Sequence, residues 1–295
     1  MKDFTPLTEK QLKEIGLKPE TVMSWFGTMP THGIDDIHGM EDVKEALRFF
    51  CTQDDRKDQL GIQRKKAVLF HGAAGTGKTY YAEALVHELM KKGYRYMRLS
   101  AGDIMSPWVG VTEKIIGTVF GTAAECAPCV LLIDDIEAVC GDRNEPSLKN
   151  FERNITIAFL RNVEDYIWYN RNQEEKPVLL IGVATHPERL DPALWNRMLG
   201  IEVGLPDAES RKAYFEHYLD GIALESGLSY EAMSEQTEGR NYYGLFRIYE
   251  QIILGLREAA QQTAGSGEDS EAYDRDIREG KIPLTAEMFR SVLER

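Results

Sequence analysis

The sequence has few cysteines and no long apolar run. Its four cysteines, Cys51, Cys126, Cys129 and Cys140, are too few and too irregularly spaced for a disulfide framework or a two-knuckle zinc site. Cys126 and Cys129 form a C-x-x-C pair, but no second Cys/His pair has ligand spacing, so we favour a structural role over redox or metal chemistry. No apolar run reaches the length of a membrane span, and the N-terminus lacks the apolar core of a secretion signal. We therefore expect no membrane partner and a reducing, cytoplasmic location.

Basic residues are also in the minority. Lysine and arginine number 35 against 48 aspartates and glutamates, which gives a formal net charge of −13 at pH 7. A surface that binds phosphate backbones throughout needs the opposite sign, so this balance disfavours nucleic acid, although a locally basic channel would escape the argument. The 295 residues suffice for a full α/β core and one smaller domain, and the 43% hydrophobic content is ordinary for a globular protein.

A strand, a glycine-rich turn and a helix are predicted in succession from residue 67. Ala67–His71 is apolar and β-prone, and the residues after the turn have helical spacing. Glycines let the backbone N–H groups of the turn point inward at a polyphosphate, and the helix adds the positive end of its dipole. Lys78 would then reach the β- and γ-phosphates while Thr79 ligates Mg²⁺. The predicted nucleotide-binding residues of this stretch are Gly72, Ala73, Ala74, Gly75, Thr76, Gly77, Lys78, Thr79 and Tyr80.

A second apolar run, Val130–Ile133, ends in Asp134 and Asp135. This pattern is typical of a strand that is buried on both faces of a parallel sheet and delivers charge at its carboxyl end, where the phosphate loop must also lie. We predict that Asp134 holds Mg²⁺ through water and that Asp135 polarises the attacking water. The alternative is that the two aspartates merely begin a turn.

The strand pattern ends near residue 207, and helical spacing follows. We expect three parts: a short N-terminal segment (1–33), an α/β P-loop domain with a parallel sheet and flanking helices (34–207), and a small helical lid domain (208–295). The biased stretch Gln261–Asp276 is interpreted as a surface loop before the last helix.

These motifs, taken in order, resemble those of the AAA ATPases within the wider AAA+ group. The likeness runs from about residue 34 to the C-terminus and is closest to ring-forming protein remodellers of the ESCRT-disassembling and microtubule-severing type. Gly72–Thr79 is similar to Walker A, Val130–Asp135 to Walker B, Asp35–Gly39 to the adenine-side segment, and Ser106–Gly110 to the first pore loop. The resemblance implies ATP and Mg²⁺ as cofactors, a homo-oligomer, specifically a hexamer, and a protein substrate that is pulled through the central pore.

The resemblance also assigns roles to single residues. It places Trp108 and Val109 on the substrate, His186 at sensor 1, and Arg197 at a neighbour's γ-phosphate, with Arg153 as a weaker candidate across the interface. An exposed amphipathic ring on a loop can press against side chains of almost any sequence. The alternatives are a buried Trp108 and a His186 without a catalytic role. The lid and adenine-side residues assigned to the nucleotide are Asp36, Ile37, His38, Tyr243, Gly244 and Arg247, the last with a solvated helix arginine as its alternative.

The sequence departs from the family pattern at Asp135, where the family usually has glutamate. Aspartate is one methylene shorter, and a misplacement of about an ångström can cost about a hundredfold in rate. Glu137 could compensate only if the chain turned back toward the nucleotide, which we do not expect. At sensor 1 the family's asparagine becomes His186, and the arginine-finger region is shortened and keeps only Arg197.

Three functions remain open at this point. The first is an ATP-driven, ring-forming remodeller that threads or disassembles proteins. The second is an ATP-gated assembly scaffold that binds nucleotide and scarcely hydrolyses it, as the shortened carboxylate of Asp135 would allow. The third, disfavoured by the charge, is a nucleic-acid-associated AAA+ loader. Substrates or adaptors are expected to reach the chain through its short N-terminal segment or through separate proteins.

Overall fold

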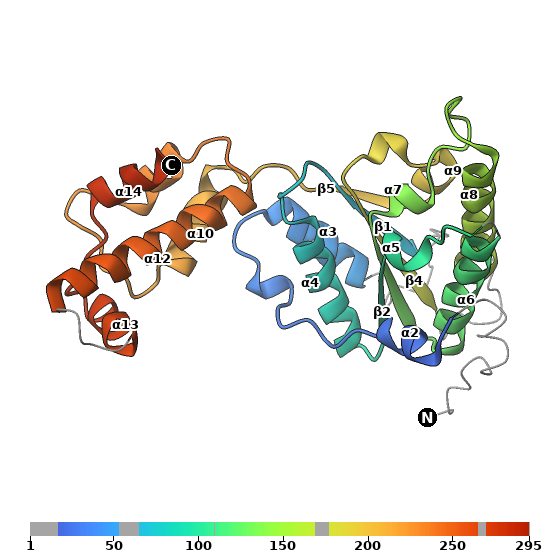
Figure 1. Ribbon diagram of the computed structural model, residues 1–295, viewed down its shortest axis with the longest axis horizontal. Helices are drawn as coiled ribbons and strands as arrows, with labels where there is room; N and C mark the ends of the chain where they lie inside the picture. The colour runs from blue at the N-terminus through green and yellow to red at the C-terminus, as the bar shows by residue number, and fades with distance from the viewer. Residues whose placement is uncertain (1–16, 53–64, 109, 169–176, 265–269, 295) are drawn as a thin grey trace. The chain divides into compact units, whose positions relative to one another are not determined.

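The structure is a computed structural model, and it describes residues 17–52, 65–108, 110–168, 177–264 and 270–294 (Figure 1). The chain divides into two compact units. The first contains most of the chain up to Val203, and the second contains Gly204–Arg295 together with two short pieces, His38–Glu41 and Gly75–Gly77. The three-part division expected from the sequence stays a prediction.

A parallel sheet forms the centre of the first unit. Its strands are β1 (Ala67–His71), β2 (Arg95–Ser100), β3 (Cys129–Asp134), β4 (Val178–Ala184) and β5 (Leu199–Glu202). Their order across the sheet is β2-β3-β4-β1-β5, and every pairing is parallel. Strands β1, β3 and β4 are buried along nearly their whole length, because helices cover both faces. The α/β P-loop architecture predicted from the sequence is therefore confirmed.

Helices of the first unit connect and cover these strands. Alternate side chains of β1, β3 and β4 pack with α6 and α8 into one core cluster, which includes Leu131, Phe120 and Phe159. The predicted helix from 151 to 169 is in fact α8 followed by a π-helical segment that ends at Trp168. The helical elements are α2 (Pro19–Ser24), η1 (Ile34–Asp36), α3 (Glu41–Thr52), α4 (Lys78–Lys91), α5 (Ala101–Ile104), α6 (Val111–Glu125), α7 (Ile136–Val139), α8 (Asn150–Val163), η2 (Glu164–Trp168), η3 (Pro187–Arg189) and α9 (Pro192–Trp195).

The second unit is helical, as expected. A core that includes Phe215, Leu245 and Phe289 lies between its helices. The interpretation of 261–276 as a loop is wrong in its described parts: α12 continues through Ala264 and a further helix begins at Ser270. The helices are α10 (Ala208–Tyr218), α11 (Tyr230–Gln236), α12 (Tyr242–Ala264), α13 (Ser270–Arg278) and α14 (Ala286–Leu293).

Two ionic hydrogen bonds explain the helix that was missed. Arg257 on α12 donates from Nε and Nη2 to the two carboxylate oxygens of Asp274 on α13, each at 2.8 Å. Ile277, one turn further along α13, is buried in the same core. A polar sequence can therefore form a helix here because one apolar side chain and one bidentate ion pair attach it to α12.

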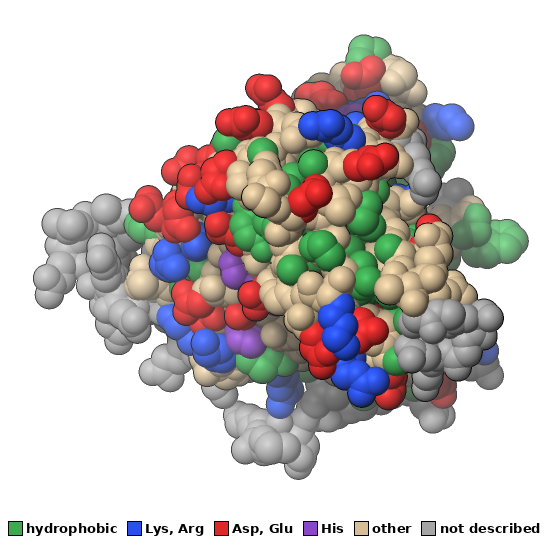
Figure 2. All heavy atoms as spheres, turned by 90° about the vertical axis from the view of Figure 1, so that its left-hand side faces the viewer, with side chains coloured by type: hydrophobic (Ala, Val, Ile, Leu, Met, Phe, Trp, Pro, Cys, Tyr) green, Lys and Arg blue, Asp and Glu red, His purple; other side chains and the backbone are tan. Residues whose placement is uncertain are grey.

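The surface carries charges of both signs. Figure 2 shows one face of the molecule, on which acidic and basic side chains are interspersed with apolar ones, without a continuous basic area among the side chains it colours. In the part of the chain that the structure describes, no helix is both long and apolar enough to cross a bilayer.

Candidate nucleotide site

The phosphate loop begins where β1 ends, at the carboxyl edge of the sheet. Gly72 has φ 142°. The Val203 N–H donates a hydrogen bond of 2.7 Å to the His71 carbonyl, which holds the segment after β5 close to the end of β1. A Cβ on Gly72 would therefore lie 2.3 Å from the carbonyl oxygen of Val203. Gly75 and Gly77 have φ 77° and 92°. These are backbone conformations that glycine adopts without the strain that a Cβ brings. The loop can therefore curl as a phosphate site requires.

Lys78 is folded back into this loop. Its side chain is 7% exposed, and its Nζ donates to the carbonyls of Gly72 (3.0 Å) and Ala73 (2.8 Å). Burial lowers the pKa of Lys78, while the carboxylates of Glu137 and, less strongly, Asp135 oppose that shift. A buried ammonium group with two carboxylates around it is thus held at the mouth of the loop, in reach of its backbone.

Thr79 and Asp134, the two predicted magnesium ligands, lie next to each other. The Thr79 hydroxyl donates to Oδ1 of Asp134 at 3.4 Å. Hydroxyl and carboxylate oxygens are the ligands Mg²⁺ prefers, and in phosphate-binding enzymes this ion takes its remaining ligands from phosphate oxygens and water. Among the described residues no group of three or more His, Cys, Asp or Glu side chains could hold a metal without such help. The pair therefore fits Mg²⁺ bound together with a nucleotide.

Arg98 on β2 is a neighbour of this site that the sequence reasoning missed. Its Nε and Nη2 donate to Oδ2 of Asp134 at 3.2 and 2.9 Å, and it also pairs with Glu83 on α4. Because Oδ1 faces Thr79, the two oxygens of Asp134 have separate partners. Arg98 thereby fixes the rotation of the carboxylate that is predicted to hold the metal.

The chain turns sharply directly after Asp134. Asp135 has φ 53°, in the left-handed region, and caps the short helix α7. The turn brings Glu137 back to the end of β4, where its Oε1 accepts hydrogen bonds from the backbone N–H groups of Thr185 (2.8 Å) and His186 (2.9 Å). The return of the chain toward β4 differs from the expectation for Glu137, because nothing in the sequence indicates a left-handed conformation at Asp135.

The other predicted catalytic side chains are engaged with their own surroundings. His186 is half exposed, and its Nδ1 lies 3.1 Å from Oε1 of Glu188. Arg197 donates to the Ala193 carbonyl at 3.0 Å, pairs with Glu164 at 3.2 Å, and lies over the Trp168 ring, 5.6 Å from its centroid. Their catalytic roles stay predictions.

Arg153 and Arg247 are the two remaining arginines to which the sequence gave a role. Arg153 donates from Nη2 to the Glu145 carbonyl at 3.4 Å. Arg247 on α12 is 3.9 Å from Glu250, one turn along the same helix, and is exposed. The second arrangement agrees with a solvated helix arginine and leaves its phosphate role a prediction.

The adenine-side residues lie beside the helix of the phosphate loop. Asp36 accepts a hydrogen bond from the Gly33 N–H at 2.7 Å, Ile37 is buried, and Tyr80 donates from its hydroxyl to the Asp36 carbonyl at 3.5 Å. His32 stacks on the Tyr80 ring with centroids 3.9 Å apart. The structure thus places Tyr80 beside Asp36 and Ile37, and their role in binding the nucleotide stays a prediction.

The second unit holds the remaining predicted nucleotide residues. Within it, the Tyr243 N–H at the start of α12 donates to the Gly75 carbonyl at 3.1 Å, and His38 stacks on His217 with centroids 4.0 Å apart. Gly244 follows Tyr243 and donates its N–H to the side chain of Asn241 at 2.8 Å. Tyr243 is therefore a neighbour of Gly75 at the loop tip, and the roles of Tyr243 and Gly244 near the adenine stay predictions.

The predicted substrate loop follows α5 and presents its aromatic ring to solvent. Trp108 is 74% exposed, so the alternative of a buried aromatic is wrong. The loop is anchored at its base, where the Ser106 N–H donates to the Thr112 hydroxyl at 2.9 Å. Val109 lies outside the described residues, and its role stays a prediction.

The C-x-x-C cysteines and Cys140 are buried in the core cluster of the first unit. Burial raises the pKa of the Cys126, Cys129 and Cys140 thiols, so these groups are poor nucleophiles and poor metal ligands. This agrees with the structural role that we favoured.

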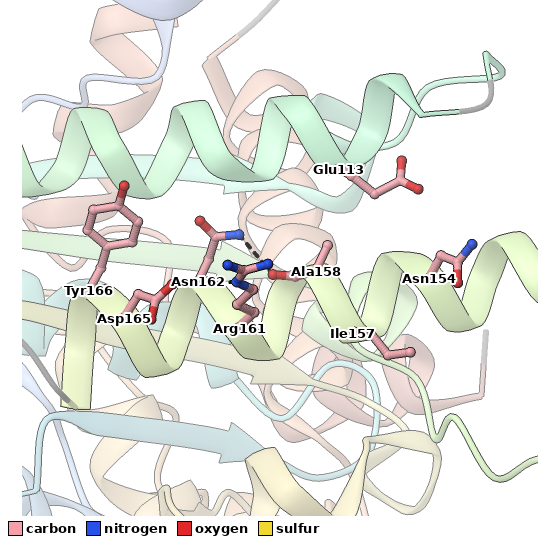
Figure 3. A pocket seen from close by; sticks show the side chains of 8 residues that line it. All are labelled: Glu113, Asn154, Ile157, Ala158, Arg161, Asn162, Asp165 and Tyr166. Atoms are coloured by element: carbon pink, nitrogen blue, oxygen red, sulfur yellow. Dashed lines mark hydrogen bonds and ion pairs between the residues drawn. The ribbon is translucent and has the colours of Figure 1, made fainter.

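A depression of about 510 Å³ lies away from the phosphate loop, between α6 and the helical segment α8–η2 (Figure 3). Glu113 borders it on α6, and Asn154, Arg161 and Tyr166 border it on the opposite side. None of the predicted nucleotide residues lines it. It is therefore no part of the candidate site.

Comparison with known proteins agrees with this geometry. Residues 68–205 match the family described as "ATPase family associated with various cellular activities (AAA)". Cell division protein C of Sulfolobus acidocaldarius is 31% identical over 217 residues, which are 71% of this chain and 56% of that protein. Meiotic spindle formation protein mei-1 of Caenorhabditis elegans is 30% identical over 223 residues, 72% of this chain and 46% of that protein.

A plant protein shows the same relation. Protein SUPPRESSOR OF K(+) TRANSPORT GROWTH DEFECT 1 of Arabidopsis thaliana is 27% identical over 209 residues, 69% of this chain and 46% of that protein. The chain thus spans about half the length of these curated relatives. The phosphate loop, the Thr79–Asp134 pair, the parallel sheet and these matches together show that the chain contains an AAA ATPase domain, the family that its motifs resemble.

Proposed function

We propose that this protein binds and hydrolyses ATP with Mg²⁺, assembles into a homo-oligomeric ring, and uses the ring to thread or disassemble protein substrates. The observation that carries the proposal is the arrangement of Lys78 inside the glycine loop, next to the Thr79–Asp134 oxygen pair. The AAA domain supports ATPase chemistry in general. The ring and the protein substrate go beyond what the family match supports.

Each residue of the candidate site has its own role in the proposed binding and hydrolysis of ATP. The N–H groups of the loop bind the phosphates, and Lys78 exchanges the carbonyls of Gly72 and Ala73 for a phosphate oxygen, which carries more negative charge. Thr79 and Asp134 hold the Mg²⁺, which neutralises phosphate charge when it is bound. Asp135 orients the attacking water, and Arg197 approaches the nucleotide of a neighbouring subunit after it leaves Glu164.

Trp108 supports the choice of protein as substrate. A large exposed ring on a loop whose base is held by the Ser106–Thr112 hydrogen bond can bury apolar area against many different side chains. A loader of nucleic acid would instead present lysine or arginine at this place.

A scaffold that binds ATP and scarcely hydrolyses it is the second candidate. Three observations favour it: Asp135 has a short side chain, His186 pairs with Glu188, and Arg197 pairs with Glu164. In this case ATP would hold the ring together, and turnover would serve only to take it apart.

The test compares steady-state ATP turnover and oligomeric mass, with and without ATP, in the wild type and in Lys78→Ala. The matched control is Lys91→Ala, which removes a lysine from the exposed end of the same helix, where its partner among the described residues is Glu88. Turnover and ATP-dependent mass in the wild type and the control, and neither in Lys78→Ala, is the expected result. A larger mass with ATP but negligible turnover would favour the scaffold, and neither turnover nor an ATP-dependent change of mass in the wild type would refute both.

A further inference from the structure

Glu137 has one carboxylate oxygen in use and one without a partner. Its Oε1 accepts from the N–H groups of Thr185 and His186 at 2.8 and 2.9 Å, which ties the end of β4 to α7. Its Oε2 is buried and has no hydrogen-bond partner among the described residues. Burying an unpaired carboxylate oxygen is costly, and a plain backbone anchor would be met as well by a neutral side chain. The hydrogen bonds to Thr185 and His186 alone therefore do not explain why this position carries a negative charge.

The buried ammonium group of Lys78 explains the negative charge of Glu137. Strands β1 and β4 are paired with His71 opposite Ala184, so Gly72, whose carbonyl accepts from Lys78, and Thr185, whose N–H donates to Glu137, directly follow adjacent strand ends. The charge of Glu137 also opposes the lowering of the Lys78 pKa by burial. An ammonium group has three N–H donors, and Lys78 places two of them on the carbonyls of Gly72 and Ala73. A buried cation with a spare donor and a buried anion with a spare acceptor thus lie at the same edge of the sheet.

From this arrangement we propose that Glu137 is a positioning residue with two tasks: its carboxylate holds the Thr185–His186 segment in place and serves as the counter-charge of Lys78. The proposal rests on the proposed nucleotide binding. When phosphates bind at the loop they compete with Glu137 for Lys78, and the same carboxylate transmits that competition to the segment at the end of β4. Glu137 therefore weakens nucleotide binding while it orders the backbone at the end of β4.

The two tasks can be separated by substitution. Glu137→Gln keeps an oxygen that accepts from Thr185 and His186 but removes the charge that Lys78 feels. Glu137→Ala removes both. Glu188→Gln is the matched control, because it makes the same chemical change in the same segment at an exposed residue that contacts His186 only through its side chain.

The measurements are backbone amide hydrogen exchange at Thr185 and His186, without nucleotide, and the equilibrium affinity for a fluorescent ADP analogue. In Glu137→Gln we expect exchange within about twofold of wild type and ADP binding that is about threefold tighter or more, since a negative charge near the phosphates is gone. In Glu137→Ala both amides should exchange about tenfold faster or more. The control should change neither quantity.

Either half of the proposal can fail separately. Unchanged ADP affinity in Glu137→Gln overturns the role as counter-charge, and unchanged exchange in Glu137→Ala overturns the clamp. If Glu137→Ala does not fold, Glu137→Asp takes its place, with faster exchange expected because the acceptor is withdrawn by one methylene. Absence of ADP binding in the wild type refutes the proposed function, and the exchange comparison still decides the clamp.

Discussion

Replacement of Asp135 by glutamate is expected to raise ATP turnover by up to about a hundredfold. Asp135 directly follows Asp134, whose carboxylate faces Thr79, so its own side chain starts at the edge of the sheet where the phosphates are proposed to bind. Glutamate would carry the carboxylate about an ångström closer to the attacking water. An improvement of that size in position is worth about two powers of ten in rate, or about 2.7 kcal/mol of activation free energy.

The same substitution should cost some stability. Asp135 has φ 53°, and the left-handed region accepts aspartate more readily than longer side chains without a local hydrogen bond. We expect the free energy of unfolding to fall by about 0.5 to 1 kcal/mol, which for a domain of this size lowers Tm by roughly 2 °C. The gain in rate and the loss in stability have opposite signs, so a general change in folding cannot produce both.

The assay is steady-state turnover at saturating ATP, with Lys78→Ala as the background. Asp135→Asn is the matched control, since asparagine tolerates the same backbone conformation and differs by the loss of the charge. We expect Asp135→Glu above the wild type and Asp135→Asn below it. Turnover within twofold of wild type in both variants would mean that the carboxylate at position 135 takes no part in the reaction, and the argument from its length would be refuted.

Three further outcomes follow from the structure. Gly72→Ala should lower the free energy of unfolding in urea by roughly 2 kcal/mol or more, because its Cβ would collide with the backbone of Val203 at a positive φ; an unchanged midpoint would contradict the close approach. Trp108→Ala should leave stability within about 0.5 kcal/mol and ADP affinity unaltered but lower the rate of substrate unfolding, measured with a fluorescent protein as substrate. Burial lowers the pKa of His71 below its ordinary value of about 6.5, so the unfolded chain binds more protons in that range and stability should fall as the pH drops below about 6.5; His71→Gln should flatten this slope in urea titrations.

The sheet and the phosphate loop could be predicted because their signals are local. Buried strands such as β3 are continuous apolar runs, and the run of glycines before Lys78 has few other uses. The pairing of Arg98 with Asp134 could not be predicted, because it depends on which strand lies beside which. Only the register that sets Ser100 opposite Asp134 brings the arginine within reach of that carboxylate.

The polar composition of residues 261–276 predicted a loop where the structure has the helix α13. The residues after 261 are polar, and polar stretches are usually surface loops. The helix α13 forms nevertheless, because Arg257 binds Asp274 through two hydrogen bonds and Ile277 enters the core. These contacts join residues that are 17 positions apart, and no local pattern contains them.

Asp135 and Glu137 must be understood together, since the backbone of one determines the reach of the other. The left-handed turn at Asp135 points α7 back toward β4, and only this turn lets Glu137 meet both the Thr185–His186 segment and the field of Lys78. The short side chain of Asp135 is compatible with the left-handed turn, and the long side chain of Glu137 can reach the backbone N–H groups of Thr185 and His186. If this division was selected for rapid hydrolysis, Asp135→Glu should not exceed the wild type. The gain in turnover that we expect would instead mean that the turn, and with it the placement of Glu137, is maintained at the expense of rate, and the turnover of the wild type itself decides between remodeller and scaffold.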